Sequence, residues 1–320
     1  MKTLRQQAIR DRAVHRGKQS FFAVFRWIFL LGFCFTILYP LVIMLSRAFM
    51  GEADLFDNGV ILLPRNPGFS TFARAIERME YWKSLGITTG LSLGVSVTQT
   101  MVCMMVGYGF ARFRFRGQSL LFALVVMTIV IPPQLIMVPL YMHFRFFDVA
   151  GLIELMTGSP ANLLDTVVPF FLLSLGGQGL KNGIFIYMFR QVFRGVPKET
   201  EEAALVDGSN AFGIFFRIMI PAVVTMIVTV GLFSFVWQYN DSTYANLFLK
   251  NTRVLSMTYG TLANSVWDNT PGIAAYLKTD EYIAARKSTG VLLMLTPILL
   301  IYGVAQRFFV EGIERSGIVG

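Results

Sequence analysis

The sequence predicts an all-α protein that crosses a membrane several times, because of its composition and the spacing of its apolar runs. Of its 320 residues, 54% are hydrophobic and 15% are charged, and the mean hydropathy is +0.58. A soluble domain has about a quarter of its residues charged. The apolar residues fall into runs of about 20 or more, the length that a helix needs to cross a bilayer. We therefore expect a polytopic membrane protein with six transmembrane helices.

The predicted spans lie within residues 27–309, the expected membrane domain. At a rise of about 1.5 Å per residue, each is long enough to cross a hydrocarbon core about 30 Å thick. The first apolar run is too long for a cleavable signal peptide, so we expect it to remain as a span. The six predicted spans are residues 27–46, 85–111, 119–142, 163–193, 218–238 and 290–309.

The distribution of charge predicts which side of the membrane each connecting segment faces. The N-terminal segment contains seven Lys or Arg residues against one acid, Asp11. Arginines also cluster in the short loop after the second span. Cytoplasmic segments next to spans are enriched in Lys and Arg, so both segments are expected in the cytoplasm. With six spans, the cytoplasmic segments are residues 1–26, 112–118, 194–217 and the tail 310–320.

Two of the predicted spans are interrupted. The third contains Ile131-Pro132-Pro133, and prolines within a span predict a kink. The fourth is too long for one straight helix and contains the glycine-rich sequence GGQGLKNG at residues 176–183. Each glycine inside a helix costs about 1 kcal/mol relative to alanine, which predicts a break here. Non-helical backbone at membrane depth is tolerated where it packs against protein or lines a cavity.

Several classes of site are excluded by the sequence. The net charge of +9 lies in segments that flank apolar runs, which indicates topology signals and not a nucleic-acid-binding face. Cys34 and Cys103 lie inside predicted spans, and His15 and His143 are isolated, so no metal site or disulfide is expected. We identify no catalytic residues. The phosphate-binding pattern Gly-x4-Gly-Lys-Ser/Thr is absent, so any ATP hydrolysis is expected on a separate polypeptide.

Residues 197–221 form a polar segment between the fourth and fifth predicted spans. Pro197, followed by glutamates in the next few positions, predicts the start of a helix. Asp207-Gly208 predicts the end of that helix, because glycine adopts the left-handed conformation easily. Ser209 and Asn210 predict the cap of a second short helix. The apolar face of the second helix is expected to carry Phe212, Phe215 and Phe216.

This polar segment resembles the EAA loop of the membrane subunits of ABC importers. The resemblance rests on Glu202-Ala203-Ala204, on Gly208 after three intervening residues, and on the sequence IMIP that ends at Pro221. Ile220 stands where the family usually has Leu. In that family the loop is cytoplasmic and its helix lies in a cleft of the ATPase subunit. The resemblance implies that the ATPase-docking residues are Glu202, Ala203, Ala204, Asp207, Gly208, Ile218 and Pro221, with Glu202 paired to a basic ATPase residue.

Other stretches resemble the carbohydrate, maltose-type branch of these importers. They are residues 111–141, with the sequences FARFRFRG (residues 110–117) and IPP, and the tail that ends at Gly320. Members often have Lys before the last Gly, where this chain has Val319. The resemblance covers about residues 20–320. It implies a bacterial plasma-membrane complex with a second, homologous membrane subunit, an extracytoplasmic solute-binding protein and two ATPase subunits that carry ATP and Mg²⁺. It also implies that this chain binds no cofactor itself.

Polar side chains of the glycine-rich break are candidates to line the path of the sugar. Gln178, Lys181 and Asn182 can donate hydrogen bonds to sugar hydroxyl groups. A lysine within a membrane is costly unless it is paired or solvated, so Lys181 indicates an anionic group on the substrate. In the alternative, the break lies at the outer surface and Lys181 extends into water. Trp237 and Asn240, at the end of the fifth span, are the remaining candidates for the substrate path.

Two other classes of protein agree less well with the sequence. A self-sufficient secondary transporter, the alternative function, has internal repeats and charged residues inside its spans. The two halves of this chain show no repeat, and its predicted spans contain almost no carboxylates. An intramembrane enzyme needs a nucleophile–base pair or metal ligands, which two isolated histidines do not supply. We therefore expect an importer subunit for an oligosaccharide, without enzymatic activity of its own.

Overall fold

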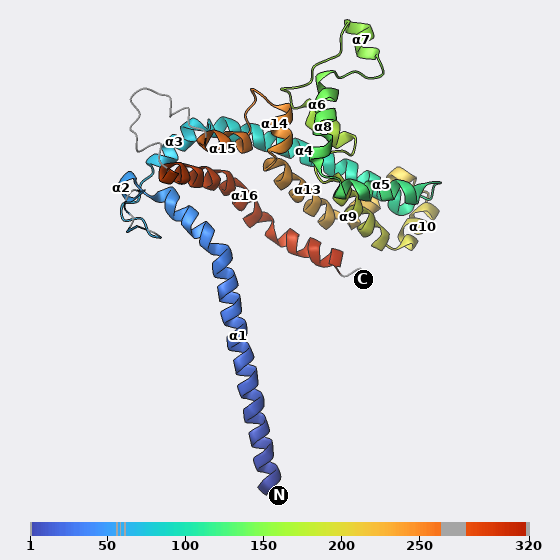
Figure 1. The fold of residues 1–320 in the computed structure, drawn as a ribbon. Helices are drawn as coiled ribbons and strands as arrows, with labels where there is room; N and C mark the ends of the chain where they lie inside the picture. Colours follow the sequence, from blue (N-terminus) through green and yellow to red (C-terminus); the bar gives the residue numbers. More distant parts are fainter. Residues whose placement is uncertain (1, 56, 58, 61, 264–279, 318–320) are drawn as a thin grey trace. The chain divides into compact units, whose positions relative to one another are not determined.

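Every regular element of the computed structural model is helical in the part of the chain that it describes, residues 2–317 without 56, 58, 61 and 264–279 (Figure 1). No β-strand occurs among these residues, which contain only isolated bridges between single residue pairs. The predicted all-α class is therefore confirmed. The chain divides into two compact units, residues 1–75 with 266–292 and residues 76–265 with 293–320.

The first unit begins with α1 (Lys2–Phe49), a helix of 48 residues. Its part from Phe22 to Phe49 contains an 18-residue stretch with a mean hydropathy of 2.5 and has mostly exposed side chains, which suits contact with lipid. This part contains the first predicted span, residues 27–46. The basic residues that precede the span lie in the same continuous helix, so they do not form a separate arm.

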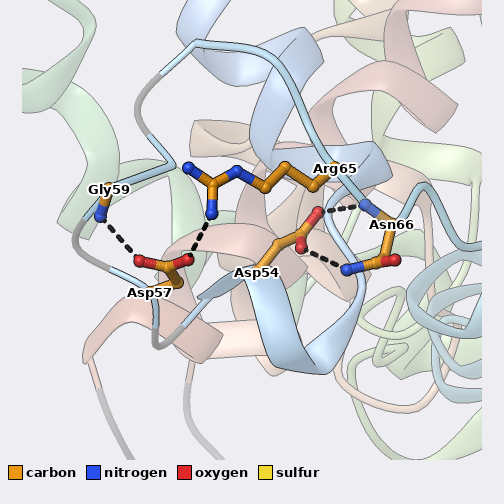
Figure 2. Close-up of polar contacts among 5 residues, drawn as sticks. All are labelled: Asp54, Asp57, Gly59, Arg65 and Asn66. Carbon is orange, nitrogen blue, oxygen red and sulfur yellow. Dashed lines mark hydrogen bonds and ion pairs between the residues drawn. The ribbon is translucent and has the colours of Figure 1, made fainter.

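Two carboxylates close the loop that follows α1, as Figure 2 shows. Asp54 accepts hydrogen bonds from the backbone N–H of Asn66 at 2.7 Å and from its Nδ2 at 3.0 Å. Asp57 accepts hydrogen bonds from the backbone N–H of Gly59 at 2.8 Å and from Nη1 of Arg65 at 3.0 Å. The backbone hydrogen bond from Asn66 lowers the pKa of Asp54 below its ordinary value, because it stabilises the charged carboxylate. These contacts connect the start of the loop, at Asp54 and Asp57, to its end, at Arg65 and Asn66.

The second unit is built around α4 (Tyr81–Arg112), which contains the second predicted span. This helix of 32 residues packs against α9 (Asn182–Gly195) and α13 (Val224–Tyr239). Gly107 lets α4 approach α9 closely, because a Cβ atom there would lie 2.6 Å from Cβ of Phe189. The apolar core of this contact includes Cys103, Phe185, Phe189, Phe193, Met219 and Val230.

The third predicted span is broken by its prolines. The helix α5 (Gln118–Val130) is followed by η1 (Pro133–Ile136) and α6 (Met137–Arg145), and the axis bends by 101° between them. Proline has no backbone N–H and disfavours helical conformation in the residue before it, so Pro132 and Pro133 end α5. The predicted kink is confirmed, but residues 119–142 do not form one helix.

The fourth predicted span is also divided, into α8 (Val168–Leu175) and α9, with a non-helical stretch at residues 176–181. The glycine-rich sequence therefore breaks the helix as predicted. We refer to residues 176–183 as the glycine-rich break.

The fifth predicted span, residues 218–238, does not form one straight helix. A π-helix, η2 (Phe215–Met219), leads into α12 (Ile220–Ala222), and the axis bends by 77° before α13 begins at Val224. Pro221 cannot donate the hydrogen bond that would continue the helix, and a π-helical turn next to it commonly accompanies a kink.

Among the described residues, three helices are long and apolar enough to cross a membrane: Phe22–Phe49, Tyr81–Arg112 and Tyr282–Val304. The number rises to five if each bent pair counts as one span. The last of the three lies within α16 (Asp280–Gly317), so the sixth predicted span continues as a helix into the predicted tail. The count of six stays a prediction because the fourth span consists of two short helices. The remaining short helices outside the site are α2 (Glu52–Leu55), α3 (Ser70–Arg78), α7 (Leu152–Thr157), α14 (Thr243–Phe248) and α15 (Leu255–Ala263).

Candidate functional site

The polar segment between α9 and α13 folds as the predicted helix, turn and helix. Its first helix, α10 (Lys198–Val206), begins directly after Pro197. Its end is a Schellman motif: the N–H of Ser209 donates to the carbonyl of Ala204 at 2.9 Å, and that of Gly208 to the carbonyl of Leu205 at 3.0 Å. Gly208 has a φ of +82°, which L-residues rarely adopt. The predicted helix stop is confirmed.

The second helix, α11 (Ala211–Ile214), has the predicted cap, because Oδ1 of Asn210 accepts a hydrogen bond from the N–H of Gly213 at 2.7 Å. The prediction of one shared apolar face for three phenylalanines is wrong. Phe215 is buried, with its ring centroid 4.9 Å from that of Tyr108 in α4. Phe212 and Phe216 are 76% and 54% exposed. The side that carries Phe215 packs on the core, which leaves the other two rings uncovered.

The exposed side of α10 and its turn presents apolar side chains next to acidic ones. Leu205 is 57% exposed and Val206 is 89% exposed, although sequence reasoning did not select either residue. Their signal in the sequence is that they follow Glu-Ala-Ala directly and precede the helix stop. We define the docking surface, named only for the role that the resemblance to importer subunits implies, as Glu202, Ala203, Leu205, Val206, Asp207, Gly208 and Phe212, all of them exposed.

The other predicted docking residues are placed differently from one another. Ala204 is 7% exposed and belongs to the apolar core, and Ile218 is partly buried against the same core. Pro221 is exposed but lies at the bend before α13. Ala204 and Ile218 therefore hold the segment on the rest of the unit and are not part of its exposed surface.

A buried ion pair joins the docking segment to the end of α4. Nε of Arg112 lies 2.7 Å from Oε1 of Glu201, and the two side chains are 5% and 18% exposed. Nη2 of Arg112 also donates to the carbonyl of Val196 at 2.6 Å. Glu201 is thus held within the chain, whereas its neighbour Glu202 is exposed and available to a partner. Sequence reasoning assigned Arg112 only to membrane topology and did not identify this pair.

A buried polar cluster lies where α4, α13 and the glycine-rich break meet. Gln99 of α4 is 1% exposed, and its Nε2 donates to the carbonyl of Leu180 at 2.5 Å and to Oδ1 of Asn182. Its Oε1 accepts a hydrogen bond from Oγ of Ser234 in α13. Nδ2 of Asn182 is buried and has no hydrogen-bond partner among the described residues. Sequence reasoning selected Asn182 but missed Gln99, whose polar side chain in the middle of a span was the available signal.

The glycine-rich break forms one wall of a cavity of about 400 Å³. The rest of the lining includes the proline kink at residues 131–133 and Thr128 of α5. Three of the predicted path residues, Gln178, Lys181 and Asn182, line this cavity.

The two path candidates at the C-terminal end of α13, Trp237 and the cap residue Asn240, behave differently. Nζ of Lys181 lies 4.9 Å from the centroid of the Trp237 ring, a cation–π contact that brings these two predicted residues together. Asn240 does not line the cavity, and its Nδ2 donates to the carbonyl of Val236 at 3.0 Å. The structure therefore assembles four of the five candidates and leaves Asn240 apart.

The comparisons of this chain with known proteins find membrane components of transport systems. The sequence profile of the family "Binding-protein-dependent transport system inner membrane component" matches residues 103–315. The arabinooligosaccharides transport system permease protein AraQ of Halalkalibacterium halodurans is 25% identical over 304 residues, which cover 93% of this chain and 98% of that protein. The inner membrane ABC transporter permease protein YcjP of Escherichia coli is 25% identical over 297 residues, which cover 90% and 93%.

A solved structure shares the fold. It is the crystal structure of a bacterial ABC transporter involved in the import of the acidic polysaccharide alginate. One of its chains superposes with a TM-score of 0.69 at 21% sequence identity, and the match covers 90% of this chain and 96% of that one.

Substitution of the two neighbouring glutamates of α10, Glu201 and Glu202, is predicted to affect the free energy of unfolding to different extents. Glu201→Gln leaves the buried Arg112 guanidinium without its charge partner, which can cost up to about 3–5 kcal/mol. Glu202→Gln changes an exposed residue and is expected to cost less than about 0.5 kcal/mol. Thermal unfolding of the purified chain in detergent measures both. Equal shifts of the midpoint would contradict the assignment of the ion pair, and Arg112→Gln combined with Glu201→Gln should recover part of the loss.

Proposed function

The chain belongs to the family of binding-protein-dependent transport system inner membrane components, and we propose that it forms half of the translocation path of an ATP-driven importer for an oligosaccharide. The family consists of transport components and not of enzymes. Its membership disagrees with the alternative of a self-sufficient secondary transporter. The name of the relative AraQ, which refers to arabinooligosaccharides, supports a sugar of several units as the substrate.

The proposed complex has this chain and a second, homologous membrane subunit in the bacterial inner membrane. Two ATPase subunits lie on the cytoplasmic side and bind ATP and Mg²⁺, because this chain lacks a phosphate-binding motif. An extracytoplasmic solute-binding protein delivers the sugar, in agreement with the family's dependence on binding proteins. The chain itself binds no cofactor in this proposal.

The observation that carries this proposal is the docking surface. It combines exposed apolar side chains with a turn that is fixed by the Schellman hydrogen bonds and by Gly208. A rigid helix and turn of this kind can bind in a cleft of an ATPase subunit and move with it. Rigid-body movement is transmitted well through packed interfaces, because these change between discrete arrangements.

Two contacts would carry this movement into the membrane. The Arg112–Glu201 pair fixes α10 to the end of α4, and Phe215 packs against Tyr108 of the same helix. Movement of the docking surface therefore displaces α4, which forms part of the polar cluster beside the cavity. In the proposed cycle, ATP closes the ATPase dimer and the two membrane subunits rock to open outward. Hydrolysis then resets them.

The position of Gln99 supports placement of the glycine-rich break within the membrane. Gln99 precedes Arg112, the basic end of α4, by 13 residues, which corresponds to about 20 Å along the helix. The hydrocarbon core is about 30 Å thick. The direct contacts of Gln99 with Leu180 and Asn182 therefore favour a break inside the hydrocarbon region over a break at the outer surface.

The cavity beside the break has the chemistry of a site for a polar, acidic sugar. Gln178 and the unpartnered Nδ2 of Asn182 supply donors for hydroxyl groups. Lys181 supplies a positive charge, which its contact with Trp237 stabilises only in part. A carboxylate of the sugar would form an ion pair with Lys181. The acidic polysaccharide imported by the transporter of similar fold is in line with such a substrate.

The docking role is tested with two glycines of the same geometry. Gly208→Asp places a charge and a strained residue in the docking surface, so we expect transport and substrate-stimulated ATP hydrolysis to fall on the order of tenfold or more. Gly117, with a φ of +83°, lies in another turn outside the docking surface, and Gly117→Asp is the matched control. Both activities are measured in the reconstituted complex. Normal stimulated hydrolysis in Gly208→Asp, or equal losses in both variants, would contradict the docking role.

The role of Lys181 is tested by uptake of acidic and neutral oligosaccharides side by side. Lys181→Met is expected to reduce uptake of an oligouronate on the order of tenfold, because a charge-assisted hydrogen bond contributes about 1.5–3 kcal/mol, and to change uptake of a neutral oligosaccharide much less. Lys83→Met is the control, because Lys83 is an exposed lysine remote from the cavity. Unchanged uptake of the oligouronate by Lys181→Met would exclude Lys181 from the substrate path.

A further inference from the structure

A second cavity, of about 430 Å³, lies at the basic end of α4, between α5 and α9. Its lining contains the basic residues Arg114, Arg190, Arg194 and Lys198, together with Arg112. Arg112 is neutralised by Glu201, and no described Asp or Glu residue lines the cavity. The cavity therefore concentrates positive charge that no described carboxylate in its lining balances.

The basic groups are arranged to receive an anion. Arg190 and Arg194 lie one turn apart on the same face of α9, where like charges repel unless an anion lies between them. The guanidinium carbon of Arg190 lies 3.9 Å from the centroid of the Phe122 ring, and this contact holds the side chain at the cavity. Its Nε is buried and has no hydrogen-bond partner among the described residues. A buried unpaired donor of this kind is costly unless a ligand satisfies it.

The surroundings of the cavity are apolar on the side of α5. Phe110 and Phe122 form part of the wall, with their ring centroids 5.5 Å apart. Around Phe122, the first two turns of α5 expose Leu120, Leu121 and Leu124 by 67%, 47% and 49%. A cationic cavity thus continues into an apolar helix surface of the kind that faces lipid.

We propose that this cavity binds the headgroup of an anionic phospholipid, with its phosphate between Arg190, Arg194 and Arg114 and its acyl chains along α5. Arginine forms strong, bidentate hydrogen bonds with phosphate oxygens. Basic cavities between membrane helices on the cytoplasmic side are suited to anionic lipid headgroups. The assignment to the cytoplasmic leaflet rests on the proposed topology, in which the loop at residues 112–118 is cytoplasmic. The binding itself does not depend on transport.

Two features favour a lipid over other sources of an anion. A free phosphate ion would pair with the arginines but would leave the leucines of α5 without a role. An acidic segment of an ATPase subunit would be expected at the docking surface, whereas Phe122 and Arg190 belong to helices within the predicted spans. The combination of arginines and exposed apolar side chains matches the two parts of one phospholipid molecule.

Native mass spectrometry of the full-length chain in a neutral detergent tests this inference. The probes are phosphatidylglycerol and phosphatidylcholine with the same acyl chains, and inorganic phosphate as a competitor. We expect one phosphatidylglycerol molecule to bind with clear preference over phosphatidylcholine. Arg114→Gln and Arg194→Gln should each weaken this binding roughly fivefold. Arg116→Gln, which removes the same charge from an exposed position of the same loop outside the cavity, should leave it unchanged.

Several results would overturn the proposal. Equal binding of the two lipids would exclude a headgroup site, as would equal losses in Arg194→Gln and Arg116→Gln. Displacement of phosphatidylglycerol by an equimolar amount of inorganic phosphate would assign the cavity to a free anion. Displacement by the purified ATPase subunit would assign it to the protein interface. Because none of these measurements requires transport, a failure here is distinguishable from a failure of the proposed importer function.

Discussion

The hydrogen bonds of Gln99 are the constraint on which the rest of the second unit depends. Backbone polar groups inside a membrane need partners within the protein, and an unpaired one costs several kcal/mol. Local turns pair the backbone N–H groups of Gly176, Gly177, Gln178 and Asn182 in the glycine-rich break. Gln99 supplies a donor for the carbonyl of Leu180 and orients Asn182, and Ser234 in turn fixes Gln99. This cluster permits a non-helical wall beside the cavity and at the same time holds α4, α9 and α13 together.

The same helix connects this cluster to the docking segment. Gln99 lies in the middle of α4 and Arg112 at its end, so one rigid element carries both the polar cluster and the buried ion pair with Glu201. The close approach of α4 and α9 at Gly107 leaves little room for the two helices to slide independently. In the proposed importer, binding of an ATPase subunit at the docking surface would therefore displace the cavity wall without a flexible intermediate.

Sequence reasoning succeeded where local chemistry decides the structure. Gly208 ends α10, Asn210 caps α11, and the prolines at 132–133 break the third span, because each effect depends on a few neighbouring residues. It failed where the outcome depends on distant partners. The partners of Gln99 and Glu201 come from other helices, and the burial of Phe215 follows from packing against Tyr108. The docking residues could be selected by resemblance, but which of them are exposed could not.

The docking of α10 on an ATPase subunit is tested most directly by site-specific cross-linking in membranes. A cysteine at Val206, which is 89% exposed in the docking surface, would carry a photoreactive maleimide in a background without Cys34. A cysteine at Leu155 in α7, 83% exposed in a segment predicted to be extracytoplasmic, is the control. We predict a covalent product with the ATPase subunit from position 206 and none from position 155. A product from position 155, or none from position 206 in an assembled complex, would contradict the docking role.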